Sequence, residues 1–177
     1  MSLGFVVGES KPTSVTAITS RSLSVGEYIK ISIDEGEILG LVERSSVSSA
    51  AFTDVKNFHE AEESTEIADI NKRDKTFTAH IGILGFLDNL RKGQSIIPAI
   101  PPIPGTEITH PTNQDLEEIF SPKKEGWLKI GNLLRNKEIE AKINLDKIVS
   151  RHLGILAMTG MGKSNLVSLI TKKISEV

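Results

Sequence analysis

Cysteine is absent from the 177 residues of this chain. Its absence excludes disulfide bonds and thiolate metal sites, and it fits an intracellular protein. No apolar run approaches the ~20 residues that a membrane-spanning helix needs. The N-terminus also lacks the charged and apolar regions of a signal peptide. We therefore expect a cytoplasmic protein with no membrane partner.

A large excess of either charge is also missing. The formal net charge is -2, so no global basic field indicates a nucleic-acid ligand. Charge is uneven locally: residues 54–74 include seven acidic and three basic side chains, and residues 123–151 include eight basic and four acidic ones. The basic segment either faces phosphates or forms a solvated surface. The four histidines are scattered and show no ligand spacing.

Short segments with alternating apolar residues fill the first part of the chain. Such alternation, broken by glycine and Asp-Glu-Gly turns, is typical of half-buried strands. Several short strands joined by tight turns predict a small barrel or sandwich. The expected strands are residues 3–8, 15–19, 27–33, 37–43 and a long one at 76–86, bent at Gly82 or Gly85.

The segments between and after these strands have other patterns. Residues 45–50 are serine-rich and predict a loop, and 52–70 have helical spacing among acids. Four prolines within 98–104 exclude a helix or a central strand there. We expect residues 97–105 to form an extended strap whose interleaved isoleucines pack on the barrel, with a polyproline ligand for a partner domain as the alternative. A short helix is expected at 112–120, and strands at 127–131 and 139–143.

The segment 157–164, AMTGMGKS, is a glycine-rich phosphate-binding loop, or P-loop. An apolar run at 152–157 predicts a buried strand before it, and apolar residues at helical spacing predict a helix over 164–174. Strand, glycine loop and helix in this order are the context in which the motif is credible. An accidental match in a helix-capping loop is the competing interpretation. The strict motif opens with glycine, whereas Ala157 stands there in this chain.

The residue types in this loop match the chemistry of phosphate binding. Gly160 and Gly162 permit positive φ and leave the backbone N–H groups open to phosphate oxygens. The following helix directs its partly positive N-terminus at the same oxygens. Lys163 is the expected catalytic contact to the β- and γ-phosphates of ATP, and Ser164 is the expected Mg²⁺ ligand. The full set of expected nucleotide-binding residues is Thr159, Gly160, Met161, Gly162, Lys163, Ser164 and Asn165.

Only thirteen residues follow Ser164, and a P-loop enzyme needs further strands, an acidic group and usually an arginine. We therefore expect an N-terminal fragment of a longer enzyme, which by itself binds nucleotide weakly and does not hydrolyse it. The expected fold class is mainly β. A small β-barrel with a helical insertion (residues 1–150) precedes the first strand, P-loop and helix of a truncated α/β domain (residues 151–177).

This order of elements resembles the HerA family of archaeal ATP-driven DNA translocases and helicases. The resemblance covers nearly the whole chain and is weakest over 45–74. The segments that carry it are 4–8, 98–106, 128–133, 139–144 and, most closely, 151–165.

The resemblance implies an N-terminal HAS-barrel followed by a RecA-like ATPase domain. It also implies a hexamer around double-stranded DNA, a NurA-type nuclease partner, and a role in DNA end resection for recombinational repair. The barrel would serve hexamer assembly and nuclease docking. Two alternatives remain open: the N-terminal part of a rotary- or secretion-type P-loop ATPase, and a non-catalytic module for oligomerisation and docking.

Overall fold

The computed structural model describes residues 1–70, 75–150, 153–156, 158 and 160–175. The chain divides into two compact units, Met1–Pro111 and Thr112–Val177, and each is described by itself. This division falls before the domain boundary that we predicted at 150/151. The reason is that the strands expected at 127–131 and 139–143 pair with each other and not with the barrel.

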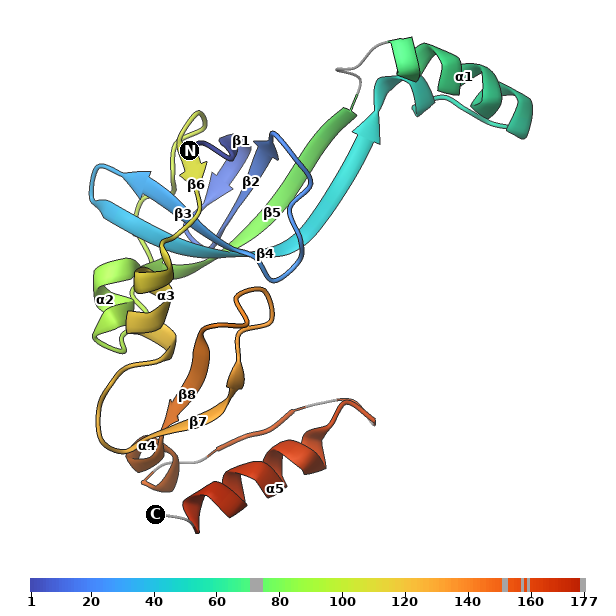
Figure 1. Ribbon diagram of the computed structural model, residues 1–177. Helices are drawn as coiled ribbons and strands as arrows, with labels where there is room; N and C mark the ends of the chain where they lie inside the picture. Colours follow the sequence, from blue (N-terminus) through green and yellow to red (C-terminus); the bar gives the residue numbers. More distant parts are fainter. Residues whose placement is uncertain (71–74, 151–152, 157, 159, 176–177) are drawn as a thin grey trace. The chain divides into compact units, whose positions relative to one another are not determined.

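Six strands of the first unit form a closed barrel in the order β1-β2-β5-β4-β3-β6, as Figure 1 shows. Every pair of neighbouring strands is antiparallel. The predicted mainly β fold with a small barrel is therefore confirmed. The strands are β1 (Gly4–Lys11), β2 (Ser14–Thr19), β3 (Tyr28–Ile33), β4 (Gly36–Ser49), β5 (Lys75–Phe86) and β6 (Glu107–Thr109).

The shortest strand, β6, closes the barrel. Ile108 is opposite Gly4 of β1 on one side and Ile31 of β3 on the other. Its side chain is fully buried. The sequence pattern did not predict this strand, because three residues after a proline-rich segment contain too little alternation to detect.

Alternation along each strand directs one set of apolar side chains into the barrel. In β3, for example, Ile29 and Ile31 are fully buried, whereas Ser32 between Ile31 and Ile33 is exposed. The core consists of Leu3, Val6, Val15, Ala17, Leu23, Ile29, Ile31, Ile38, Val42, Ala79, Ile81, Ile83 and Ile108.

Strands β4 and β5 extend beyond the barrel as a two-stranded arm (Figure 1). Ser45 of β4 is opposite Ala79, and Ser49 is opposite Lys75. The predicted loop at 45–50 is therefore wrong for residues 45–49, because pairing with β5 outweighs the weak strand propensity of serine. A 3-10 turn (Ala50–Phe52) and helix α1 (Phe58–Ile70) follow β4, which confirms the helical insertion.

The proline-rich strap lies against the barrel in an unexpected orientation. Pro98 and Pro102 are buried, whereas Ile100 and Ile103 are 61% and 69% exposed. The strap follows the short helix α2 (Leu87–Arg91). Backbone hydrogen bonds fix both ends of the strap, from Phe86 N to Ile96 O (3.0 Å) and from Gly105 N to Val6 O (2.8 Å). The prediction that the isoleucines pack on the barrel is therefore wrong.

The second unit begins with helix α3 (Asn113–Phe120), whose N-terminus has a capping box made by Thr112 and Asp115. Strands β7 (Trp127–Asn132) and β8 (Glu140–Asn144) form a separate antiparallel pair. Two helices follow, α4 (Leu145–Val149) and α5 (Lys163–Ile174). Among the helices that the structure describes, none combines the length and the hydropathy needed to cross a membrane.

Candidate functional site

The last two residues of the glycine-rich segment, Lys163 and Ser164, begin helix α5. Gly162 is the N-cap of this helix and has φ 79°, and Gly160 has φ 84°. Both values lie in the left-handed region that glycine adopts without steric cost. Met161 N donates to Met158 O across the turn (3.2 Å). The expectation of positive φ at both glycines is therefore confirmed.

The space beside these two glycines is open. A Cβ atom built at either position would have no other heavy atom within 4 Å. Glycine is thus required by backbone conformation, not by crowding within the chain. The open surface gives a ligand access to the N–H groups of the first helical turn, which have no partner within the helix.

The electrostatics of this helix end favour an anion. The first turn of α5 contains no acidic residue, and the helix dipole places partial positive charge there. Lys163, Ser164 and Asn165 are exposed. Among the described residues, none forms an ion pair with Lys163. These residues fit the phosphate groups of a nucleotide.

One face of α5 is apolar, and its side chains hold the helix against the rest of the second unit. Ile170 is buried, and Leu166 and Leu169 are half-buried. A largely apolar cavity of about 540 Å³ lies on this side, lined by residues that include Trp127, Ile143, Leu166 and Ile170. The hairpin β7–β8 and α5 therefore share one apolar surface, a grouping that the sequence pattern did not predict.

The segment before the loop differs from its prediction. Residues 153–156 form no strand, and Leu156 is 98% exposed. The predicted buried strand is therefore wrong for these residues. A strand needs a hydrogen-bonded neighbour, and no described strand pairs with this segment. Ala157 and Thr159 lie outside the described residues, so their expected roles stay predictions.

The basic residues of 123–151 are not all available to a ligand. Glu140 forms ion pairs with Lys129 (2.8 Å) and Lys142 (3.3 Å). Hydrogen bonds from Lys129 and then Lys142 lower the pKa of the Glu140 carboxyl. Lys129 and Lys142 thus have a partner within the hairpin, which favours the solvated-surface interpretation for that part.

The described residues define a protein with an N-terminal β-barrel and a glycine-rich loop at the N-terminus of a later helix. Comparison with known proteins shows which proteins have a similar sequence. Residues 128–176 match the family model of the helicase HerA central domain. The match includes the hairpin β7–β8, in agreement with the compact unit that begins at Thr112.

Curated relatives match the chain over nearly its whole length. It is 34% identical over 99% of its residues to a probable helicase of Methanocaldococcus jannaschii, of which it spans 33%. The DNA double-strand break repair helicase HerA of Saccharolobus solfataricus is 30% identical over 100% of the chain, which spans 34% of that protein. The protein of that name from Pyrococcus furiosus is 30% identical over 98%, with 31% spanned. The chain spans about a third of the length of these relatives, and over that third it is similar to proteins of the HerA family.

Proposed function

We propose that this chain is the barrel and nucleotide-binding part of an ATP-driven translocase or helicase that acts on double-stranded DNA in recombinational repair. Two observations taken together carry the proposal. The glycine loop and α5 have the geometry of a phosphate site, and the whole chain is related to helicases named for double-strand break repair.

Each residue of the site has a proposed task. The backbone N–H groups of Gly160, Gly162 and Lys163 donate to the phosphate oxygens, and the two glycines leave that approach open. The Lys163 ammonium reaches the β- and γ-phosphates and offsets charge there. The Ser164 hydroxyl would hold Mg²⁺, which when bound neutralises charge on the phosphate oxygens. Thr159, Met161 and Asn165 border the nucleotide.

The remaining catalytic groups are proposed to come from the part of the relatives that this chain does not span. Those groups are an acidic residue that positions water and an arginine that stabilises developing charge. On this proposal the 177-residue chain binds nucleotide weakly and does not turn it over. The longer protein hydrolyses ATP.

For the barrel we propose assembly and docking. Its strands pair with one another around the closed barrel, so the unit needs no strand from a partner to complete its sheet. Exposed isoleucines on the strap, Ile100 and Ile103 among them, offer apolar surface for a neighbouring protein. The proposed neighbours are further subunits, in a hexamer, and a NurA-type nuclease.

A second candidate is a non-catalytic module for oligomerisation and docking. It is favoured by the contrast between the closed barrel and the exposed, unpaired segment 153–156. On this reading the chain holds partners and leaves nucleotide chemistry to other proteins.

Substitution of Lys163 in the full-length protein tests the nucleotide site. Lys163→Ala removes a charged hydrogen-bond donor, which is worth roughly 1.5–3 kcal/mol, so ATP affinity should fall about tenfold to a hundredfold. ATP turnover should be abolished. Lys172→Ala, at an exposed position in the last turn of the same helix, is the matched control and should bind normally.

Unchanged ATP binding and turnover in Lys163→Ala would refute the nucleotide site. Normal ATP binding by the wild-type protein without any turnover, in the presence of DNA, would instead favour the non-catalytic module.

A further inference from the structure

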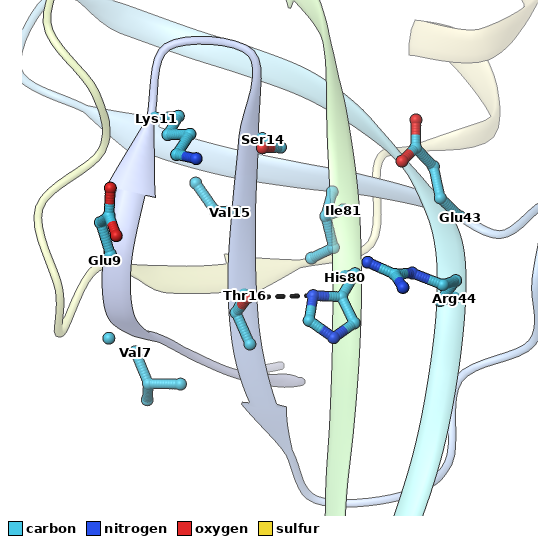
Figure 2. Close-up of a pocket in the computed structure, with 11 residues that line it drawn as sticks. Val7, Glu9, Lys11, Ser14, Val15, Thr16, Glu43, Arg44, His80 and Ile81 are labelled. Carbon is cyan, nitrogen blue, oxygen red and sulfur yellow. Dashed lines mark hydrogen bonds between the residues drawn. The ribbon is translucent and has the colours of Figure 1, made fainter.

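A second cavity, separate from the glycine loop, lies in the wall of the barrel. Its volume is about 420 Å³, and Figure 2 shows the side chains around it. Strands β1, β2, β4 and β5 supply the lining. The lining residues are Val7, Gly8, Glu9, Lys11, Ser14, Val15, Thr16, Glu43, Arg44, His80 and Ile81.

Strand register brings one row of polar side chains together in this cavity. Thr16 of β2 is opposite His80 of β5, and His80 is opposite Arg44 of β4. The neighbours Val15 and Ile81 are buried in the core, so Thr16 and His80 belong to the outer face of the sheet. A register irregularity between Val42 and Arg44 interrupts the alternation of β4, and such irregularities re-aim side chains.

The hydrogen bond between Thr16 Oγ1 and His80 Nδ1 is 3.1 Å long. It fixes the ring in the cavity wall, as Figure 2 shows, with the Arg44 guanidinium beside it. Because Nδ1 is engaged, the second ring nitrogen, Nε2, is the one left for a ligand. With Nδ1 accepting from the Thr16 hydroxyl, Nε2 carries the proton, and His80 and Arg44 then offer N–H donors from two neighbouring strands.

A second pair of donors lies one step along β2. Ser14 is two residues before Thr16, on the same face and about 6.8 Å away. Lys11 is opposite Ser14 in the register of β1 and β2, and its side chain lies beside Ser14 in Figure 2. Among the described residues, none forms an ion pair with Lys11 or Arg44. Two cations, the Ser14 hydroxyl and one remaining donor of the Thr16–His80 pair therefore line the cavity.

The two carboxylates of the lining affect selectivity. Glu43 lies against the α-carbon of Gly82 and points away from His80 in Figure 2. Glu9 is on the far side of β1 from His80. Together they balance the formal charge of Lys11 and Arg44, so long-range attraction alone does not hold an anion here. A ligand must form direct hydrogen bonds with the donors.

We propose that this cavity is a second phosphate-binding site, which takes a single tetrahedral phosphate group between Arg44 and Lys11. Arginine and lysine form charge-assisted hydrogen bonds with phosphate oxygens, Ser14 and His80 Nε2 complete the shell, and Thr16 holds the His80 ring. The group belongs either to the sugar–phosphate backbone of DNA or to a small phosphorylated molecule. Neither the family relationship nor the glycine loop assigns this site.

The test uses the 177-residue chain and inorganic phosphate, with the ring protons of His80 observed by NMR. Titration should shift the His80 signals saturably, and sodium chloride of equal ionic strength should not. The His80→Asn variant identifies the signals. Lys11→Gln and Arg44→Gln should each weaken phosphate binding about tenfold, the loss typical of a charged hydrogen bond. Lys92→Gln, at an exposed position on the same unit, is the matched control.

The Lys163→Ala variant distinguishes this site from the glycine loop, because it weakens phosphate binding at the loop alone. The His80 shift should persist in that variant, so each site can fail without the other. Absence of a saturable His80 shift, or equal weakening by Lys92→Gln, would overturn the proposal.

A second arm identifies the source of the phosphate. A fluorescent DNA duplex is titrated with the wild-type chain and with Arg44→Gln, in the Lys163→Ala background. A loss of affinity of about tenfold, with competition by phosphate, assigns the site to the DNA backbone. Unchanged duplex binding, together with the His80 shift, assigns it to a small phosphorylated molecule.

Discussion

The barrel and the segment before the glycine loop both have strand-like sequence, but only the barrel segments form strands. Ile31 in β3 is opposite Ile38 of β4 on one side and Ile108 of β6 on the other, and it is fully buried. Residues 153–156 are equally apolar, yet they pair with no described strand, and Leu156 is 98% exposed. Helix α5, which begins at Lys163, forms nearby in the sequence because its hydrogen bonds are local. The difference shows that a strand depends on partners elsewhere in the chain, whereas a helix does not.

Two natural reporters make this comparison measurable. The sequence has one tyrosine and one tryptophan. Tyr28 lies in β3 of the barrel, and Trp127 lies in β7 of the second unit. Unfolding in urea, followed at both side chains, reports on the two units separately.

The largest effect is expected from Ile108→Ala. This change removes the fully buried side chain of the strand that closes the barrel, and such truncations cost about 2–5 kcal/mol. The free energy of unfolding detected at Tyr28 should fall by that amount. Ile103→Ala, at a 69% exposed strap position, should change it by no more than about 0.5 kcal/mol. If Ile108→Ala costs no more stability than Ile103→Ala, β6 is not essential to the barrel.

Two glycine substitutions should have opposite signs in the two units. A Cβ at Gly4 would collide with the backbone of Ile18, so Gly4→Ala should destabilise the barrel by about 1–3 kcal/mol. Gly131 in β7 has open space around it and no positive φ. Gly131→Ala should therefore stabilise the second unit by roughly 0.4–1 kcal/mol, seen at Trp127. A destabilising Gly131→Ala would mean that β7 is packed more closely than the hairpin shows.

A smaller effect is expected from Thr112→Ala at the N-terminus of α3. The Thr112 hydroxyl accepts a hydrogen bond from Asp115 N (3.1 Å), and the Asp115 carboxylate accepts one from Thr112 N (2.9 Å). Loss of such a cap costs about 1 kcal/mol. The Trp127 transition should move and the Tyr28 transition should stay. Thr112→Ser keeps the hydroxyl and should restore stability; failure to do so would exclude capping as the cause.

The smallest effect concerns the pH dependence of the barrel. Burial alone raises the pKa of the Glu27 carboxyl, but hydrogen bonds from Arg21 and from Ser24 N–H outweigh it and leave the pKa below its usual value. A carboxyl with a lowered pKa stabilises the folded state above its unfolded pKa, and this contribution is lost as the pH falls through the folded value. Because Arg21 is 49% exposed, solvent screens the pair and the contribution stays below about 1 kcal/mol.

Glu27→Gln should therefore lower the free energy of unfolding at pH 7 and have little effect near pH 3. Urea titrations at both pH values, detected at Tyr28, measure the difference. An equal loss at pH 3 would assign the role of Glu27 to shape and not to charge.

Sequence pattern predicted the elements whose signal lies within a few neighbouring residues. The alternation of β3, the helical spacing of α5 and the positive φ of Gly160 and Gly162 are examples. It missed β6, and it indicated a loop at Ser45–Ser49, because these segments are strands only through their partners.

The two candidate sites divide in the same way. The residues of the glycine loop are contiguous, so a motif is enough to find them. The Arg44–His80–Thr16 row is assembled from three strands by register. No spacing along the sequence indicates that row, because 64 positions separate Thr16 from His80.

The closing strand has a consequence for synthesis on the ribosome. Gly4 pairs with Ile108, about a hundred residues later in the chain. Until β6 has emerged, the outer edges of β1 and β3 have no partner from this chain, and unpaired strand edges invite pairing with other chains. Such long-range closure is also slow compared with helix formation. The nascent barrel is therefore most exposed to aggregation, and most in need of a chaperone, in the interval before residue 109 leaves the exit tunnel.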